Sequence, residues 1–329
     1  MLFALDAMGG DFAPDEPCKG AIMVCREEPG LSVALVGKKE LIEPRLERVE
    51  SSVRSRIDIV DAPEVIGMGD NPASSIRTRK NSSMRIIMEM VRSKEAAGCI
   101  SAGNTGAIVA GGVLVVGRIQ GIDRPGLAVP IPALRGTSLL LDVGATVRCK
   151  ALNLYQFAHM GSIYMSSLSG IAEPSIALLS NGLEDIKGDE VISEAREMLS
   201  ESKLNFEGYV EGKDVPLGRT DVVICDGFTG NALIKFGEGI GEIVKEVVRE
   251  EIESHILPKI GAALMMPALK KIWSRFEHEK RGGSPLLGVD GIVVKAHGNS
   301  KDRAIAGALK VALGFAQLKG TELIKGSAD

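Results

Sequence analysis

Short apolar stretches rich in Val, Ile and Leu recur along the chain, separated by segments with helical spacing. The strand-like stretches span 2–7, 31–36, 56–61, 99–102, 138–143, 175–179, 221–225 and 291–296. Between them, residues 189–201 and 231–252 place apolar side chains three and four positions apart, as amphipathic helices do. This alternation predicts an α/β fold with a mostly parallel sheet. Ligands of such sheets bind in the crevice at the carboxyl ends of the strands.

Most of the predicted strands end in a turn that combines glycine with short polar side chains. Glycine lets a ligand approach the main chain, and the helix N-terminus after the turn presents N–H groups to an anion. We expect several of these turns to converge on one sheet edge as an anion site. Its candidate residues are Asp6, Gly9, Gly10, Ser101, Gly103, Asn104, Thr105, Gly106, Asp142, Asp226, Gly227, Phe228, Thr229, Gly230 and Asn231.

The same side chains have structural interpretations. Asn104, Thr105, Thr229 and Asn231 are typical helix caps. An acid beside an anion is electrostatically unfavourable, so Asp6, Asp142 and Asp226 fit better as residues that orient loops by accepting backbone N–H bonds. Neither a Walker-type G-x-x-x-x-G-K-[ST] motif nor a G-x-G-x-x-G after a strand occurs, which argues against an ordinary nucleotide site.

Composition narrows the class of protein. Hydrophobic residues make up 45% of the chain and charged residues 25%, as in a folded globular protein, and the net charge of -4 argues against nucleic-acid binding. Five scattered cysteines and no cleavable apolar leader predict a reduced, cytoplasmic protein. The longest nearly apolar run, 107–117, is shorter than the roughly 20 residues that cross a bilayer.

Two further segments suggest partners. A basic patch formed by Arg77, Arg79 and Lys80 would attract an acidic protein or phosphate, or is an ordinary solvated turn. The second segment, 255–276, carries an apolar face with flanking cations, which suits a helix on a bilayer surface, a dimer interface or core. Pro258 and Pro267 predict that it breaks into short pieces of an exposed helical hairpin. Its apolar residues are Met265, Leu269, Ile272, Trp273 and Phe276.

Long motifs in this chain resemble those of a known family. They are Leu-Asp-Ala-Met-Gly-Gly-Asp-Phe-Ala-Pro at 5–14, Ile-Ser-Ala-Gly-Asn-Thr-Gly-Ala at 100–107, Asp-Val-Val-Ile-Cys-Asp-Gly-Phe-Thr-Gly-Asn at 221–231 and Pro-Leu-Leu-Gly-Val-Asp-Gly-Ile at 285–292. In this order they resemble the signatures of PlsX, the bacterial phosphate acyltransferases of phospholipid synthesis. The chain departs from the family pattern at Thr146, Arg148, Ala151 and 179–184.

The resemblance implies reversible transfer of a long-chain acyl group from acyl carrier protein to inorganic phosphate, giving acyl phosphate. It implies a three-layer α/β/α sandwich related to phosphotransacetylases and isopropylmalate dehydrogenases, without metal or organic cofactor. We expect a single domain over 1–329 with a protruding helical segment at about 253–280, in a homodimer. Acyl phosphate would pass to a membrane glycerol-3-phosphate acyltransferase, so we expect a cytoplasmic protein with peripheral membrane contact.

The reaction assigns roles to particular residues. Backbone N–H groups at 103–106 and 227–230 would bind phosphate or the oxyanion, and Asn231 would add a side-chain hydrogen bond. Lys187 is the candidate cation for phosphate, and His297 the candidate proton donor to the leaving thiolate. Two structural alternatives remain open: Lys187 is a solvated loop lysine, and His297 is a structural histidine. Two other functions also remain open: a dehydrogenase or phosphotransferase using the same crevice, and a membrane-surface scaffold.

Overall fold

The fold is built around one mixed sheet. The computed structural model describes residues 1–182, 189–280 and 282–327, and these form an eleven-stranded sheet of order β3-β2-β1-β4-β11-β10-β5-β6-β9-β7-β8. The strands are β1 (Leu2–Asp6), β2 (Ser32–Gly37), β3 (Ile57–Asp61), β4 (Gly98–Ser101), β5 (Gly126–Ala133), β6 (Gly136–Leu141), β7 (Ile176–Leu179), β8 (Phe206–Val210), β9 (Val222–Ile224), β10 (Ser284–Leu287) and β11 (Ile292–Lys295). The predicted α/β class and mostly parallel sheet are confirmed.

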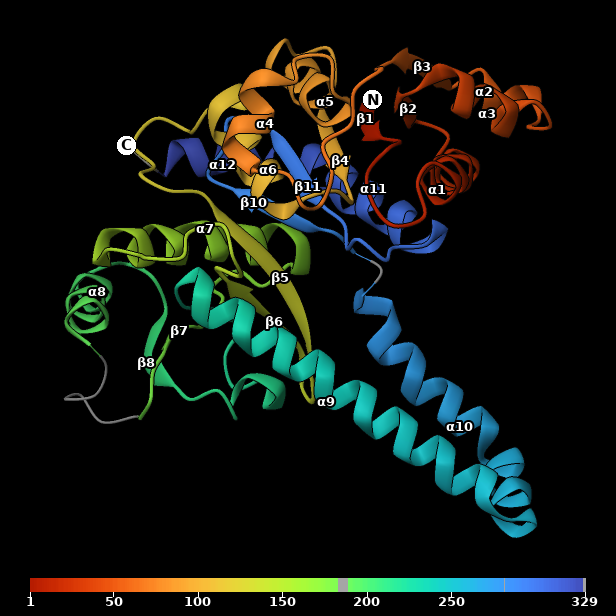
Figure 1. The fold of residues 1–329 in the computed structure, drawn as a ribbon. Helices are drawn as coiled ribbons and strands as arrows, with labels where there is room; N and C mark the ends of the chain where they lie inside the picture. Colours follow the sequence, from red (N-terminus) through yellow and green to blue (C-terminus); the bar gives the residue numbers. More distant parts are fainter. Residues whose placement is uncertain (183–188, 281, 328–329) are drawn as a thin grey trace.

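Helices cover both faces of the sheet (Figure 1). They are α1 (Asp15–Glu27), α2 (Lys39–Leu46), α3 (Ser51–Arg54), α4 (Pro72–Thr78), α5 (Ser83–Arg92), α6 (Thr105–Gly111), α7 (Ala151–Ser169), α8 (Glu190–Ser200), α9 (Gly227–Ser254), α10 (Ile256–Lys280), α11 (Asp302–Gln317) and α12 (Gly320–Gly326), with a short π-helix η1 (Gly112–Val116) and a 3₁₀-helix η2 (Val215–Leu217). Successive strand residues face opposite cores. Phe3 and Leu5 pack in one cluster with α1, α7 and α11, whereas Ala4 packs in the other with α5 and α6. The arrangement is the expected three-layer sandwich.

The sheet contains two parallel blocks that run in opposite directions. The first is β3-β2-β1-β4-β11 and the second is β6-β9-β7-β8. Between them, β10 pairs antiparallel with β11 and with β5, and β5 pairs antiparallel with β6. Three antiparallel pairings reverse the strand direction. The polar turns therefore form two groups instead of converging on a single edge, as the sequence had suggested.

Three strands escaped prediction, two of them because they contain proline. Pro130 and Pro132 interrupt the β5 stretch, and Pro285 interrupts β10. Proline donates no N–H and is confined to strand positions where none is needed. Beyond Leu127, β5 pairs with no strand other than β6 within the described residues, so no second ladder needs the N–H groups that Pro130 and Pro132 lack.

Helices α9 and α10 form a hairpin that projects from the body of the molecule (Figure 1). The predicted break at Pro258 and Pro267 is wrong: α10 runs without interruption from Ile256 to Lys280. Pro258 lies in the first turn, where a helical N–H has no intrahelical acceptor, so proline costs little there. α9 begins at Gly227, four residues before the predicted start, because the side chain of Asp226 caps it.

Candidate active site

The first group of turns is organised by Asp6 at the end of β1. Its buried carboxylate accepts hydrogen bonds from Ser101 Oγ at 2.7 Å and from the Met8 amide at 3.0 Å. Ser101 Oγ in turn accepts from the Gly103 amide at 3.0 Å. Burial raises the pKa of Asp6, and these hydrogen bonds oppose the rise. Asp6 therefore holds the β1 and β4 turns together, as the structural interpretation predicted.

Only glycine fits at positions 9 and 10 of the turn after β1. A Cβ on Gly9 would lie 2.7 Å from Asp6 Oδ2 and 2.8 Å from the Gly103 nitrogen. Gly10 has φ +97, in the left-handed region that other residues rarely adopt. The turn after β11 closes this group, since the Asp11 amide donates to the Gly298 carbonyl at 2.8 Å.

Asn104 caps α6 and also fastens the loop at 67–70. Its Oδ1 accepts from the Ala107 amide at 3.0 Å, and its Nδ2 donates to the carbonyl oxygens of Gly67, Met68 and Asp70. Within the described parts of the chain, no acceptor binds the backbone N–H groups of Asn104, Thr105 and Gly106. These three groups remain as donors for an anion.

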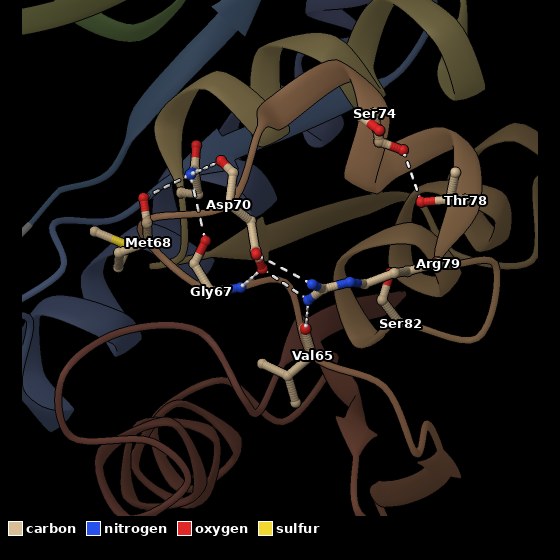
Figure 2. A network of polar contacts seen from close by, with 9 residues as sticks. Val65, Gly67, Met68, Asp70, Ser74, Thr78, Arg79 and Ser82 are labelled. Atoms are coloured by element: carbon tan, nitrogen blue, oxygen red, sulfur yellow. Dashed lines mark hydrogen bonds and ion pairs between the residues drawn. The ribbon is translucent and has the colours of Figure 1, made fainter.

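Arg79 supports the same loop from the far side (Figure 2). Its guanidinium contacts the Asp70 carboxylate at 2.7 Å and donates to the Val65 carbonyl at 2.5 Å. Asp70 also accepts from the Gly67 amide at 2.7 Å. Of the predicted basic patch, Arg77 and Lys80 are exposed, whereas Arg79 is half-buried in this network.

The second group of turns is organised by Asp142, at the end of β6. Its fully buried carboxylate accepts from four backbone amides: Thr146 at 2.6 Å, Leu127 at 2.8 Å, Ala145 at 3.0 Å and Gly144 at 3.1 Å. Burial raises the pKa of Asp142, and the four N–H groups oppose that rise. Thr146, a departure from the family pattern, is built into this network, because its Oγ1 donates to the Pro125 carbonyl at 3.0 Å.

The first turn of α9 is already saturated with partners. Asp226 Oδ1 accepts from the Phe228 and Thr229 amides, both at 2.9 Å, and Oδ2 accepts from Thr229 Oγ1 at 2.6 Å. The Gly227 amide donates to the Thr146 carbonyl at 2.9 Å, and the Gly230 amide to the Asp226 carbonyl at 3.0 Å. The amides at 227–230 are therefore not the free donors that the sequence suggested.

A cavity of about 1270 Å³ opens beside this end of α9. Its apolar wall comes from β7, β9, α7, α8 and α9, and its polar residues include Arg148, Asn181, Asp189, Asp226 and Thr229. The apolar lining consists largely of Val147, Leu154, Leu178, Leu179, Val191, Ile192, Ile224, Ala232, Leu233 and Phe236. The volume exceeds the usual range of small-molecule sites, so it has room for a long apolar group.

Two cysteines, Cys149 and Cys225, line this cavity. Burial raises the pKa of Cys149 to about 12 and raises that of Cys225 well above its usual value. The thiolate is the nucleophilic form of cysteine, and these thiols stay protonated at neutral pH. A covalent acyl-cysteine is therefore disfavoured.

The three predicted catalytic residues have different outcomes. Lys187 lies outside the described residues. Asn231 is exposed on α9 beside the Asp142 loop, since a Cβ on Gly144 would lie 3.9 Å from Asn231 Cβ. His297 belongs to the first group of turns, and its Nε2 lies 3.5 Å from Glu238 Oε1 of α9. α9 therefore extends from the second group of turns to the first.

Sequence reasoning missed Lys295 and the cavity residue Arg148. Lys295 is the last residue of β11, directly before the turn that carries His297. A lysine that closes the run Ile-Val-Val-Lys was the available signal, because polar residues at the end of a buried parallel strand belong to the ligand crevice. Arg148 carried no such signal, since only the folded loop brings it to the cavity.

The chain is similar to known proteins over nearly its whole length. A family model described as "Fatty acid synthesis protein" matches residues 1–322. Phosphate acyltransferase of Heliobacterium modesticaldum is 47% identical over 312 residues, covering 95% of this chain and 93% of the relative. That of Thermoanaerobacter pseudethanolicus is 44% identical over 315 residues, covering 96% and 93%. The chain belongs to this family. It is an acyltransferase of fatty acid and phospholipid synthesis, which sets aside the dehydrogenase and scaffold hypotheses.

Solved structures of this acyltransferase's fold include acyl-transferring enzymes. A phosphotransacetylase from Streptococcus pyogenes superposes with a TM-score of 0.66 at 15% identity, covering 96% of this chain and 94% of that one. A branched-chain phosphotransacylase from Enterococcus faecalis gives a TM-score of 0.57 at 14% identity, covering 95% and 99%. At these identities the likeness shows the fold alone, and it confirms the predicted relation to phosphotransacetylases.

The described residues contain neither a membrane-spanning helix nor a metal-ligand cluster. No helix among them combines the length and the apolar character that crossing a bilayer requires. Nor do three or more His, Cys, Asp or Glu side chains there gather as metal ligands would.

Proposed function

We propose that the protein transfers a long-chain fatty acyl group from acyl carrier protein to inorganic phosphate, forming acyl phosphate for phospholipid synthesis. The observation that carries this proposal is the apolar cavity of about 1270 Å³ beside Asp226 and Thr229, which suits an alkyl chain. The name of its relatives, phosphate acyltransferase, supports phosphate as the second substrate.

The proposed step is direct attack on the thioester. A phosphate oxygen forms a bond to the acyl carbonyl carbon, and the bond from that carbon to sulfur breaks. The carrier thiolate leaves and takes up a proton, for which His297 is the candidate donor. The raised pKa of Cys149 and Cys225 supports attack by phosphate without an acyl-cysteine. Positioning of the two substrates contributes on the order of 7–11 kcal/mol to lowering the barrier.

The two groups of turns suit the two reactants. The acyl chain would lie in the cavity, and its thioester would extend past Asn231 along α9 to the phosphate beside His297, as direct attack requires. Phosphate would approach from the first group, where the amides of Asn104–Gly106 are without acceptors in the described chain. α9 links the two groups of turns, because Asn231 lies beside the second group and Glu238 contacts His297 of the first. These two α9 residues are about 10 Å apart along the helix at 1.5 Å per residue.

Exposed surfaces suit the proposed partners. Arg77 and Lys80 are available to the acidic carrier protein. An apolar stripe on α9, formed by Phe236, Ile240, Ile243 and Val247, has exposed fractions of 45–69% and suits a second copy of the chain. We call this set the α9 stripe. A homodimer would bury it, since apolar surface of this extent is unfavourable in water.

The hairpin tip suits a lipid surface. Ile256, Leu257, Leu264 and Met265 are 58–80% exposed, and Lys259 lies among them. We call this set the hairpin tip; it suits peripheral contact of a cytoplasmic enzyme with the membrane that holds the glycerol-3-phosphate acyltransferase. Of the other residues predicted for this contact, Leu269 is half-buried, and no side-chain position is described for Ile272, Trp273 and Phe276.

The test of the proposed function is release of free carrier thiol from palmitoyl-carrier protein, with and without inorganic phosphate. Mass spectrometry follows the acyl product. Phosphate-dependent release together with acyl phosphate supports the proposal. Release that does not depend on phosphate, or no release from intact substrate, overturns it.

A further inference from the structure

Lys295 occupies a position in the sheet that the mechanism above leaves unused. It is the last residue of β11 and pairs in parallel register with Ser101 of β4, the residue that holds the Asp6 carboxylate. Val293, two residues earlier, packs in the cluster on the α5 and α6 face, so alternation places the Lys295 side chain on that same face. Lys295 is only partly accessible to solvent.

Among the described residues, the charged groups that act on Lys295 come from α9. Lys235 and Glu238 of α9 both act on it electrostatically. The Glu238 carboxylate is already engaged, since it lies 2.7 Å from Lys235 Nζ and 3.5 Å from His297 Nε2. In the described parts of the chain, no side chain forms an ion pair or hydrogen bond with the Lys295 ammonium.

The balance of charge in this corner favours an anion. The nearby carboxylates already have donors: Asp6 accepts from Ser101 and the Met8 amide, and Glu238 contacts Lys235 and His297. Among the described residues, Lys295 has no ion pair or hydrogen bond of its own. Burial, followed by repulsion from Lys235, lowers the pKa of Lys295, and Glu238 opposes the shift. A half-buried ammonium without a counter-ion is unfavourable for the folded protein, and a bound anion removes that penalty.

We propose that Lys295 is the cation that binds the incoming inorganic phosphate, with the exposed Lys235 as a second, weaker contact. This inference rests on the proposed function and deepens it, because it assigns the nucleophile's site to the first group of turns. It requires no role for Lys187 in phosphate binding. The acyl chain then occupies the cavity of the second parallel block, and each substrate has its own block.

The test compares Lys295→Met, Lys295→Arg and the control Lys310→Met. Lys310 pairs with Glu27 at 2.8 Å on α11, away from both groups of turns. We expect Lys295→Met to raise KM for phosphate at least tenfold while KM for palmitoyl-carrier protein stays within twofold. Lys295→Arg should recover part of the phosphate affinity, and Lys310→Met should match the parent. A phosphate KM within twofold of the parent in Lys295→Met overturns the proposal.

A direct binding measurement separates this inference from the proposed function. Inorganic phosphate is titrated into the protein without acyl donor, and its ³¹P line width reports binding. Broadening with the parent and Lys295→Arg, but not with Lys295→Met, supports the site even if transfer from carrier protein fails. Equal broadening with the parent and Lys295→Met overturns the site even if transfer succeeds. Thermal melts establish that each variant is folded.

Discussion

At the scale of single residues, buried carboxylates organise both groups of turns. Asp6 joins β1 to β4 through Ser101, and Asp142 gathers four amides from two segments. Each carboxylate is costly to bury, and the N–H and O–H donors around it offset that cost. The sequence allowed this role to be predicted, because an acid after an apolar strand has nearby amides to accept from. The specific donors follow only from the fold.

Asp142→Ala leaves buried N–H groups without an acceptor. We expect it to lower the free energy of unfolding by about 2–3 kcal/mol, as unsatisfied buried donors do. It should also raise KM for the acyl donor, because the loop beside Asn231 loses its anchor. Chemical denaturation and steady-state kinetics measure the two effects. Asp58→Ala, on the exposed side of β3, is the control and should change neither.

Lys295 gives a test of stability that differs from the test of binding. Its pKa in the folded protein lies below the ordinary value of about 10.4, so the unfolded chain holds the extra proton between these two pKa values. Stability of the parent therefore rises with pH through that window. We expect Lys295→Met to melt at a higher temperature than the parent at pH 7.

That advantage of Lys295→Met should shrink as the pH rises toward about 10.4, where the parent loses the charge in both states. Among the described residues, Lys235 and Glu238 of α9 act on it electrostatically, and both are kept in both proteins. Melting curves at pH 7 and pH 9.5 measure the change. A lower melting temperature for Lys295→Met at pH 7 would mean that the lysine is structural and not held for a ligand.

At the scale of elements, prediction succeeded where local pattern alone determines structure. Apolar runs such as 2–7 and 31–36 became strands because both faces of the sheet are buried. Prediction failed for β5 and α10 because both contain proline, which the local pattern interprets as a break. The free-energy cost of a proline depends on whether a neighbouring acceptor needs the missing N–H. An unpaired strand edge and the first turn of α10, where Pro258 lies, do not need it, and neither is visible before the fold is known. Pro267 lies inside α10, and nothing in the structure explains why the helix continues through it.

The basic patch combines two roles: Arg79 stabilises the loop at 67–70, and Arg77 is available to the carrier protein. We expect Arg79→Ala to lower the melting temperature and to speed exchange of the amides at 67–70, because Asp70 and Val65 lose their partner. Arg77→Ala should leave both unchanged and raise KM for carrier protein about threefold, with the effect lost at high salt. Hydrogen exchange and kinetics at two salt concentrations measure this. Equal carrier-protein defects without loss of stability would instead assign both arginines to the patch.

The hairpin contains two exposed apolar sets with separate predicted partners. Leu257→Glu, in the hairpin tip, should reduce co-sedimentation with phosphatidylglycerol vesicles at least fivefold and leave the dimer mass unchanged. Val247→Glu, in the α9 stripe, should lower the mass to that of a monomer and keep vesicle binding. Sedimentation equilibrium and vesicle pelleting measure the pair. Loss of both properties in either variant would contradict the assignment of separate surfaces.

At the scale of the whole molecule, the site depends on two parallel blocks of opposite direction. The polar turns could be predicted from the sequence, but their division into two groups could not. The strand direction reverses at β10 and β5, and the prolines in these two strands prevented their prediction. The sequence also could not show that Asp226 accepts from the amides in the first turn of α9. Nor could it show that Glu238, farther along α9, contacts His297 in the first group of turns. Contacts between residues distant along the chain decide these features.

The continuity of α9 sets a rule for which chain lengths this protein tolerates. Each residue of a helix turns about 100° and advances 1.5 Å. One residue inserted between Asn231 and Lys235 would rotate both Lys235 and Glu238 away from Lys295 while Asn231 kept its place. Insertions beyond Val248 would change only the reach and direction of the hairpin. The seven-residue interval thus fixes where Lys235 and Glu238 lie relative to the first turn of α9, whereas the outer half of the helix carries no residue of either group of turns.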